Sequence, residues 1–359
     1  MCDLIQNGGI KFKTMNTKFI IVLIFLIPNI LISQNIRLRL NFSGAEEFLK
    51  LVQSDSIDTS KINRLLSTEP YQKMCEWTKS GLRLNMVDLK NIFYHALLNY
   101  DLDKKYKTDD FCGQMISYMI ECIKNGKSNP EILHQKIIEL KNNFDVDSIK
   151  RITLKYIPEE NIDIDITIYF VVGLAQGVVK GNYAGIEILY ASNNESTYLW
   201  LAHELYHCFT LRLPYETIVD STYETLNKIL YYLVDEGIAT AISDPSINER
   251  EIEFANAYLM RFDFILKIAF KSNQKKKFDN LKKTIDNPTA HDVGKVMAHI
   301  IKEQFGITEL KNCARKPKLF LLKYQEAAKK INNPEIVYIF DELTVKKIKE
   351  LKWEIRKPE

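Results

Sequence analysis

The 359-residue sequence has few of the features that mark small disulfide-rich proteins or repeat proteins. Its six cysteines are widely spaced and contain no CxxC pair, so neither a disulfide framework nor a cysteine-based zinc site is indicated. A single disulfide bridge remains open. There are also no internal repeats, low-complexity linkers or long heptad seams. No repeat architecture or coiled coil is therefore indicated, and the oligomeric state stays open.

The sequence also lacks an excess of charge of either sign. Its 49 Lys and Arg residues nearly balance 46 Asp and Glu residues, which gives a net charge of +3. Without a strong electrostatic field, nucleic acid and acidic lipid are not expected partners. Hydrophobic residues make up 46% and aromatic residues 11% of the chain. That composition is sufficient for one large core, or for two lobes that share a cleft.

One apolar run stands out, close to the N-terminus. Lys18 precedes the run Phe19–Ile32, which contains Pro28. The run is shorter than the about 20 apolar residues that a membrane-spanning helix needs, and it fits the apolar part of a signal peptide. We expect residues 1–33 to be a signal peptide with an upstream extension. The mature protein is then exported, periplasmic or secreted, without stable membrane insertion.

The periodicity of apolar residues changes along the chain. From about Gly44 to Asn143 they recur at intervals of three and four, which predicts helices. They alternate with polar residues in Ile152–Tyr156 and again in Ile162–Ile168, which predicts strands, and a third strand is expected from Gly185 to Tyr190. From about Glu195 the pattern is again helical. The fold class predicted is a predominantly helical α+β protein.

The segment HELYH at residues 203–207 fits the pattern H-E-x-x-H. On a helix, His203 and His207 lie on one face and converge on one ion, while Glu204 points to the adjoining flank. An apolar stripe on a different face of this helix consists of Leu201, Leu205 and Cys208. The spacing predicts a zinc-binding helix. The alternative is two unrelated helical histidines, with Glu204 in a salt bridge.

Catalytic zinc needs a third protein ligand and an open position for water. Glu236, within the segment Leu233–Ala239, is the best candidate, and its neighbour Asp235 is the alternative. The acid that is not a ligand would support a ligand histidine. Gly237 and Ala239 would let this helix pack closely on the first and bring the acid to the metal. The remaining interpretation is a surface charge near a helix end.

The HELYH segment, followed by DEGIA at residues 235–239, resembles the gluzincin metallopeptidases, and in particular bacterial families described as zinc-dependent peptidases. In those families the acid before the glycine is the third ligand, which implies that His203, His207 and Glu236 hold Zn²⁺. The resemblance covers most of the mature chain and implies a zincin-like fold, with a small sheet before the metal helix. The Asn-Glu pair of thermolysin-like third-ligand motifs is missing.

The resemblance also implies a role for a later histidine. Such enzymes commonly use a Tyr or His from outside the metal helices to hydrogen-bond the oxyanion, and His291 is in the corresponding place. His299, two turns further along, is a weaker candidate. A helix-capping or exposed histidine is the alternative for His291.

These residues together predict a zinc-dependent metallopeptidase that acts on a peptide or protein substrate. Zinc would activate water and polarise the scissile carbonyl, and Glu204 would carry the proton from that water to the leaving amine. The strand near Gly185–Tyr190 would pair with an extended peptide by edge addition. The alternatives are a non-catalytic exported binding protein with a metallopeptidase fold, and a zinc amidase acting on a non-peptide substrate.

The expected domain organisation follows from the motif and the periodicity. After the leader come an N-terminal helical part at residues 34–145 and the zincin-like sheet with the metal-binding helices at residues 146–245. A C-terminal helical part follows at residues 246–359.

Overall fold

The computed structural model describes residues 35–358, except 109, 159–162, 175–176, 273–277, 279–280, 282–286 and 334. The predicted leader, residues 1–33, lies outside the described residues. Within the described ranges, no helix is long and apolar enough to cross a membrane. Five cysteines fall in these ranges, and none of them forms a disulfide there.

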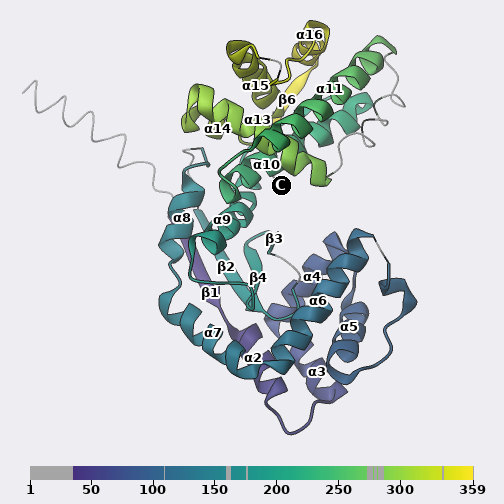
Figure 1. The fold of residues 1–359 in the computed structure, drawn as a ribbon, viewed down its shortest axis with the longest axis vertical. Helices are drawn as coiled ribbons and strands as arrows, with labels where there is room; N and C mark the ends of the chain where they lie inside the picture. The colour runs from purple at the N-terminus through teal and green to yellow at the C-terminus, as the bar shows by residue number, and fades with distance from the viewer. Residues whose placement is uncertain are drawn as a thin grey trace, which may run out of the picture.

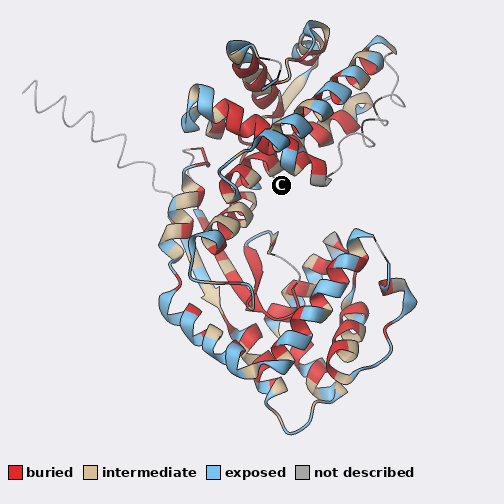
Figure 2. Ribbon diagram, viewed as in Figure 1, coloured by how far each residue is buried: buried red, intermediate tan, exposed pale blue. Residues whose placement is uncertain are grey.

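The chain forms two helical lobes, and one of them also contains a small sheet (Figure 1). Helix α9 (Glu195–Thr210) lies between the sheet and the helices of the second lobe. This arrangement confirms the predicted class, a predominantly helical α+β fold. Figure 2 shows that the helices of each lobe bury the sides that face one another, whereas their outer sides are exposed.

The first lobe contains the four-stranded sheet and the helices that surround it. Its elements in chain order are β1 (Asn35–Asn41), α2 (Ser43–Val52), α3 (Thr59–Leu66), α4 (Glu69–Gly81), α5 (Met86–Leu98), η1 (Lys104–Tyr106), α6 (Phe111–Ser128), α7 (Pro130–Asn143), α8 (Val146–Leu154), β2 (Asp163–Val171), β3 (Val178–Lys180) and β4 (Tyr183–Glu187).

The four-stranded sheet has the order β1-β2-β4-β3. Strands β1 and β4 pair parallel with β2, and β3 pairs antiparallel with β4. Strand β2 confirms the strand predicted for Ile162–Ile168. Ile164, Ile166 and Ile168 are buried while Asp163 is exposed, as expected for side chains that point to opposite faces of a sheet.

The strand predicted for Ile152–Tyr156 is wrong, because this segment belongs to the end of helix α8 and the turn after it. The Asp145 side chain accepts a hydrogen bond from the Ser148 backbone N–H and caps the helix. Ile149 and Thr153, four residues apart, are fully buried on one side of that helix. An alternation of only three apolar residues also fits one and a half helical turns, so it did not discriminate between the two structures.

The edge-addition prediction is also wrong for the strand to which it was assigned. Strand β4 lies between β2 and β3, so its backbone hydrogen-bonding groups are already paired along the part that β3 covers. The edges of this sheet are β1 and β3. Strand β1 was not predicted, although Ile36, Leu38 and Leu40 alternate with polar residues and so carry the period-two signal of a strand. Its pairing with β2, which follows by more than 100 residues, leaves no local signal.

The second lobe is almost entirely helical. Its elements after α9 are β5 (Tyr215–Ile218), η2 (Ser221–Tyr223), α10 (Glu224–Ser243), α11 (Glu249–Ser272), α13 (Asn287–Phe305), α14 (Ile307–Asn312), α15 (Pro317–Ile331), α16 (Glu342–Glu350) and β6 (Trp353–Arg356). Strands β5 and β6 pair antiparallel and join the start of this lobe to the C-terminal segment. They interrupt the helical pattern that the sequence predicted to run to the end.

Helices α10 and α13 cross in backbone contact at a pair of glycines. A Cβ atom added to Gly237 would lie 2.5 Å from the carbonyl carbon of Gly294, and one added to Gly294 would lie 2.3 Å from the carbonyl oxygen of Leu233. The sequence predicted that Gly237 allows a close approach to the metal helix, but its nearest neighbour belongs to α13. This crossing fixes the distance between the helices that carry Glu236 and His291.

A buried lysine that pairs with two partly exposed carboxylates holds α13 in place, two turns beyond the glycine crossing point on α10. The Lys295 side chain is only 2% exposed. Its ammonium group pairs with Asp244, which directly follows α10, and lies 2.7 Å from the Glu251 carboxylate of α11. The two carboxylates hold the pKa of Lys295 above its usual value, although burial alone would lower it. Lys295 is therefore charged and links three helices.

Replacing Gly237 with Ala should destabilise the fold, because the new methyl group would overlap the backbone of Gly294. Overpacking of this kind costs about 1–3 kcal/mol of unfolding free energy. Urea titration followed by circular dichroism measures the change. Lys228→Ala, at an exposed position of the same helix, is the control and should be about as stable as the parent. If Gly237→Ala were as stable as the parent, the two helices would have space for the methyl group, and the close crossing would be contradicted.

Candidate metal centre

Helix α9 presents the two histidines of the HELYH segment side by side. Its N-terminus is capped by the Asn194 side chain, which accepts a hydrogen bond from the Thr197 backbone N–H. The predicted apolar stripe of Leu201, Leu205 and Cys208 is fully buried. The opposite face carries His203 and His207, whose Nε2 atoms lie 3.3 Å apart. Burial of the stripe therefore points both imidazoles away from the core.

Glu236, on helix α10, completes a triangle of metal-binding atoms. Its Oε2 atom lies 3.3 Å from Nε2 of His207 and 3.8 Å from Nε2 of His203. Ligands at about 2.0–2.1 Å from a tetrahedral zinc ion lie about 3.3–3.4 Å from one another. The spacing and the chemistry of these three groups, two imidazoles and a carboxylate, therefore fit a zinc ion.

Asp235 points to the outer side of His207 instead of joining this triangle. Its Oδ2 accepts a hydrogen bond from Nδ1 of His207 at 2.9 Å, and its Oδ1 accepts one from the Thr210 hydroxyl at 3.1 Å. A carboxylate can only accept, so Nδ1 of His207 carries a hydrogen, and Nε2 is the nitrogen that would bind a metal ion. The acid that the sequence could not separate from Glu236 thus orients a histidine.

Two hydroxyl groups that the sequence analysis missed hold the other imidazoles. Ser243 lies 3.3 Å from Nδ1 of His203, and Thr240 lies 3.0 Å from Nδ1 of His291. His203 also hydrogen-bonds the backbone of Ala239. Thr240 and Ser243 follow Glu236 by four and seven residues, so they share its face of α10. Their spacing from Glu236 was the sequence signal that could have identified them as neighbours of the metal site.

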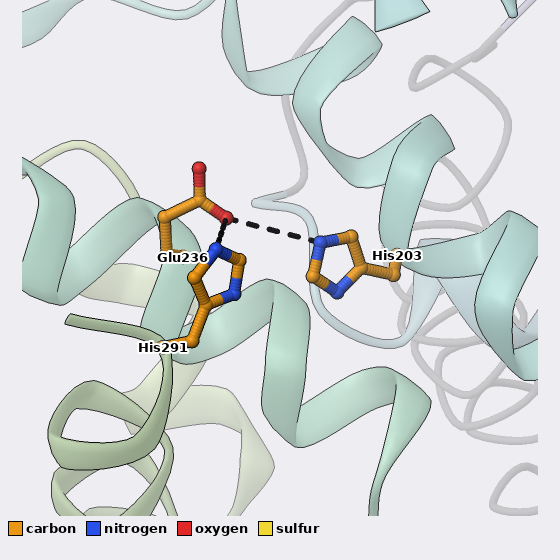
Figure 3. A group of neighbouring side chains, drawn as sticks. All are labelled: His203, Glu236 and His291. Atoms are coloured by element: carbon orange, nitrogen blue, oxygen red, sulfur yellow. Dashed lines mark ion pairs between the residues drawn. The ribbon is translucent and has the colours of Figure 1, made fainter. Parts of the chain in front are cut away.

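His291, in the first turns of α13, is brought to the same place. Its Nε2 lies 3.4 Å from Oε2 of Glu236, and its ring stacks on that of His203 with centroids 5.9 Å apart. Figure 3 shows the His203 and His291 side chains both directed at the same oxygen of the Glu236 carboxylate. His299 is buried elsewhere, against the Asp244 carbonyl. Of the two later histidines, only His291 reaches the site.

Burial and mutual charge shift the pKa values of these groups strongly. Burial lowers the pKa of His203 to about 3, and the neighbouring His207 adds to the effect. Burial alone would raise the pKa of Glu236, but the hydrogen bond from His207 and the nearby imidazoles lower it to about 2. Glu236 is therefore ionised and His203 neutral at pH 7, which are the forms that bind a metal cation. Burial would lower the pKa of His207, but the Asp235 and Glu236 carboxylates raise it well above its usual value, so a metal ion would displace the proton at its Nε2.

Glu204 lies beside the three proposed ligands, and among the described residues its carboxylate makes no hydrogen bond or ion pair with them. Burial raises its pKa to about 7, against the opposing effect of His207. Together with His203 and His291 it lines a cleft of about 1080 Å³. A carboxyl group with a pKa near neutrality, facing a cleft next to a metal site, is suited to accept and return a proton.

A comparison with known protein families agrees with this geometry. A family model described as "Putative zinc dependent peptidase (DUF5700)" matches residues 62–333, which is most of the chain. The match supports the predicted resemblance at the level of the family and zinc as the predicted cofactor. No curated protein and no solved structure matches the chain. The roles of individual residues remain predictions.

Zinc content should separate the ligands from their supporting residues. After dialysis, His203→Ala and Glu236→Ala should retain far less than one zinc ion per chain, because each removes one of three donors. Asp235→Asn should keep the site but weaken zinc binding about 10–100-fold, since the orientation of His207 is lost. Emission spectrometry and competition with a chelator measure the two effects.

His134→Ala, an exposed histidine on α7, is the matched control and should bind zinc like the parent. Equal zinc content in His203→Ala and the control, or a larger loss in Asp235→Asn than in Glu236→Ala, would show that the ligand set is wrong.

Proposed function

We propose, from the premise that this chain belongs to the family described as zinc-dependent peptidases, that it hydrolyses peptide bonds with Glu204 as general base. His203, His207 and Glu236 would hold the zinc ion. The observation that carries the proposal is the convergence of their Nε2 and Oε2 atoms within 3.3–3.8 Å, with Glu204 on the cleft side.

The bound zinc would supply Lewis-acid activation of water and of the scissile carbonyl. Glu204 would accept the proton that the attacking water loses and then transfer it to the amine of the leaving peptide. Asp235 would keep the Nε2 lone pair of His207 available by accepting the hydrogen on Nδ1. The walls around Glu204 reduce its contact with bulk water, which keeps its proton affinity near the range that the reaction needs.

We assign His291 the stabilisation of the oxyanion. Its Nε2 faces the Glu236 carboxylate, which can only accept, so in the neutral ring this nitrogen carries the hydrogen. The Thr240 hydroxyl then donates to Nδ1 and fixes that tautomer. With the Glu236 oxygen bound to zinc, this N–H group, on the cleft wall beside the metal triangle, would no longer be held by Glu236 and would donate to the negative charge that develops on the carbonyl oxygen.

Replacing Glu204 with Gln should leave the zinc content unchanged and lower the turnover number about 10²–10⁴-fold, because the amide cannot accept a proton. Hydrolysis of a mixed peptide library, followed by mass spectrometry, measures the loss. Glu195→Gln changes an exposed carboxylate on the same helix and should remain as active as the parent. If Glu204→Gln were equally active, another group would be the base.

Replacing His291 with Ala should lower the turnover number about 10²–10³-fold with little change in KM, since the lost hydrogen bond forms mainly in the transition state. Steady-state kinetics and zinc analysis of the same preparation test this. Retained zinc together with reduced turnover is the expected pair of results. Loss of zinc in His291→Ala would instead make His291 a ligand and contradict its assignment to the oxyanion.

A further inference from the structure

The cleft beside the metal residues has an aromatic wall that the proposed chemistry does not use. Phe111 and Tyr118, on helix α6, are 60% and 49% exposed, and Tyr190, just after strand β4, is 49% exposed. The rings of Tyr118 and Tyr190 lie next to each other, with centroids 6.1 Å apart. All three residues line the cleft. We call Phe111, Tyr118 and Tyr190 the aromatic wall.

The aromatic wall is part of the first lobe, whereas the metal residues come from α9, α10 and α13. Trp200 of α9 also lines the cleft, one helical turn before Glu204, and so extends the apolar surface to the general base. Phe111, Met115 and Tyr118 follow one another at intervals of four and three and so share one face of α6. One continuous surface therefore runs from aromatic side chains to the reactive groups.

Charged groups are scarce along this surface. None of the described residues that line the cleft is Lys or Arg, so no fixed cation is present to bind the terminal carboxylate of a peptide. Outside the metal centre, the one acid among these lining residues is Glu187. Its side chain is fully buried and already accepts hydrogen bonds from the backbone N–H groups of Gly173 and Leu174. It is therefore not available to a terminal ammonium group.

We infer that the cleft binds internal segments of peptides and places a large aromatic or aliphatic side chain against the aromatic wall. The inference rests on the proposed function, because it names the substrate class of the same site. Burying exposed aromatic rings against an apolar side chain stabilises a complex, and edge or offset contact with another ring stabilises it further. A cleft of about 1080 Å³ exceeds the usual size of a small-molecule site and accommodates several residues of an extended chain.

The first test uses the zinc-loaded chain and a peptide library made in two forms, with free ends and with acetylated and amidated ends. Mass spectrometry maps the cleaved bonds. We expect both forms to be cleaved equally, at internal bonds close to Phe, Tyr, Trp, Leu or Met. Cleavage without enrichment of these residues, or only of peptides with free ends, would overturn the inference and leave the proposed function intact.

The second test changes the aromatic wall itself. Tyr118→Ala should lower kcat/KM for a blocked peptide with Phe near the cleaved bond about tenfold, and much less for the same peptide with Ala. Phe111→Ala should act in the same direction. Phe264→Ala is a matched control, because Phe264 on α11 is also 60% exposed but does not line the cleft. Equal effects on both peptides would contradict the inference.

The third test measures binding without hydrolysis and separates the two proposals. The zinc-loaded Glu204→Gln chain should bind the blocked Phe peptide about tenfold more tightly than the Ala peptide in calorimetry, and Tyr118→Ala should remove this difference. Selective binding without any cleavage by the parent chain would contradict the proposed function but support the substrate class. Cleavage by the parent chain together with equal binding of both peptides would support the proposed function but contradict the substrate class.

Discussion

The site depends on one constraint: a single carboxylate, that of Glu236, must meet the Nε2 atoms of three imidazoles from two other helices. Its Oε2 lies within 3.3–3.8 Å of His203, His207 and His291. Such a group of partly buried polar side chains is costly unless each remaining polar atom has a partner. Helix α10 meets that requirement almost alone, since Glu236 and the three side chains that orient the imidazoles, Asp235, Thr240 and Ser243, all belong to it.

The position of α10 is set by packing against α13 as well as against the metal helix. The contact of Gly237 with Gly294 brings the two backbones together, and the buried Lys295 pairs with carboxylates on both sides. A hydrophobic contact alone would allow α13 to slide along α10, whereas an ion pair and a glycine crossing each define a register. The reach of His291 to the metal site follows from that register.

The local parts of this arrangement could be predicted from sequence, whereas the parts that depend on helix rotation could not. The HELYH segment predicted a helix with both imidazoles on one face, because that relation spans a single turn. The choice between Asp235 and Glu236 depends on how α10 is rotated against α9, which many distant contacts decide. Strand β1 differs, because Ile36, Leu38 and Leu40 alternate with polar residues and this local signal was overlooked; only its pairing with β2 depends on distant contacts. The three-residue alternation at Ile152–Tyr156 was too short to distinguish a strand from a helix.

The aromatic wall could not be predicted from sequence either. Its exposed rings come from α6 and from the end of β4, and they lie beside the reactive groups only because the two lobes pack together.

The central claim concerns the ligands, and X-ray absorption spectroscopy of the zinc-loaded chain tests it most directly. The account predicts a first shell of only nitrogen and oxygen at about 2.0–2.1 Å, with the outer-ring scattering of two imidazoles. A sulfur shell at about 2.3 Å, or no stoichiometric zinc to measure, would contradict it.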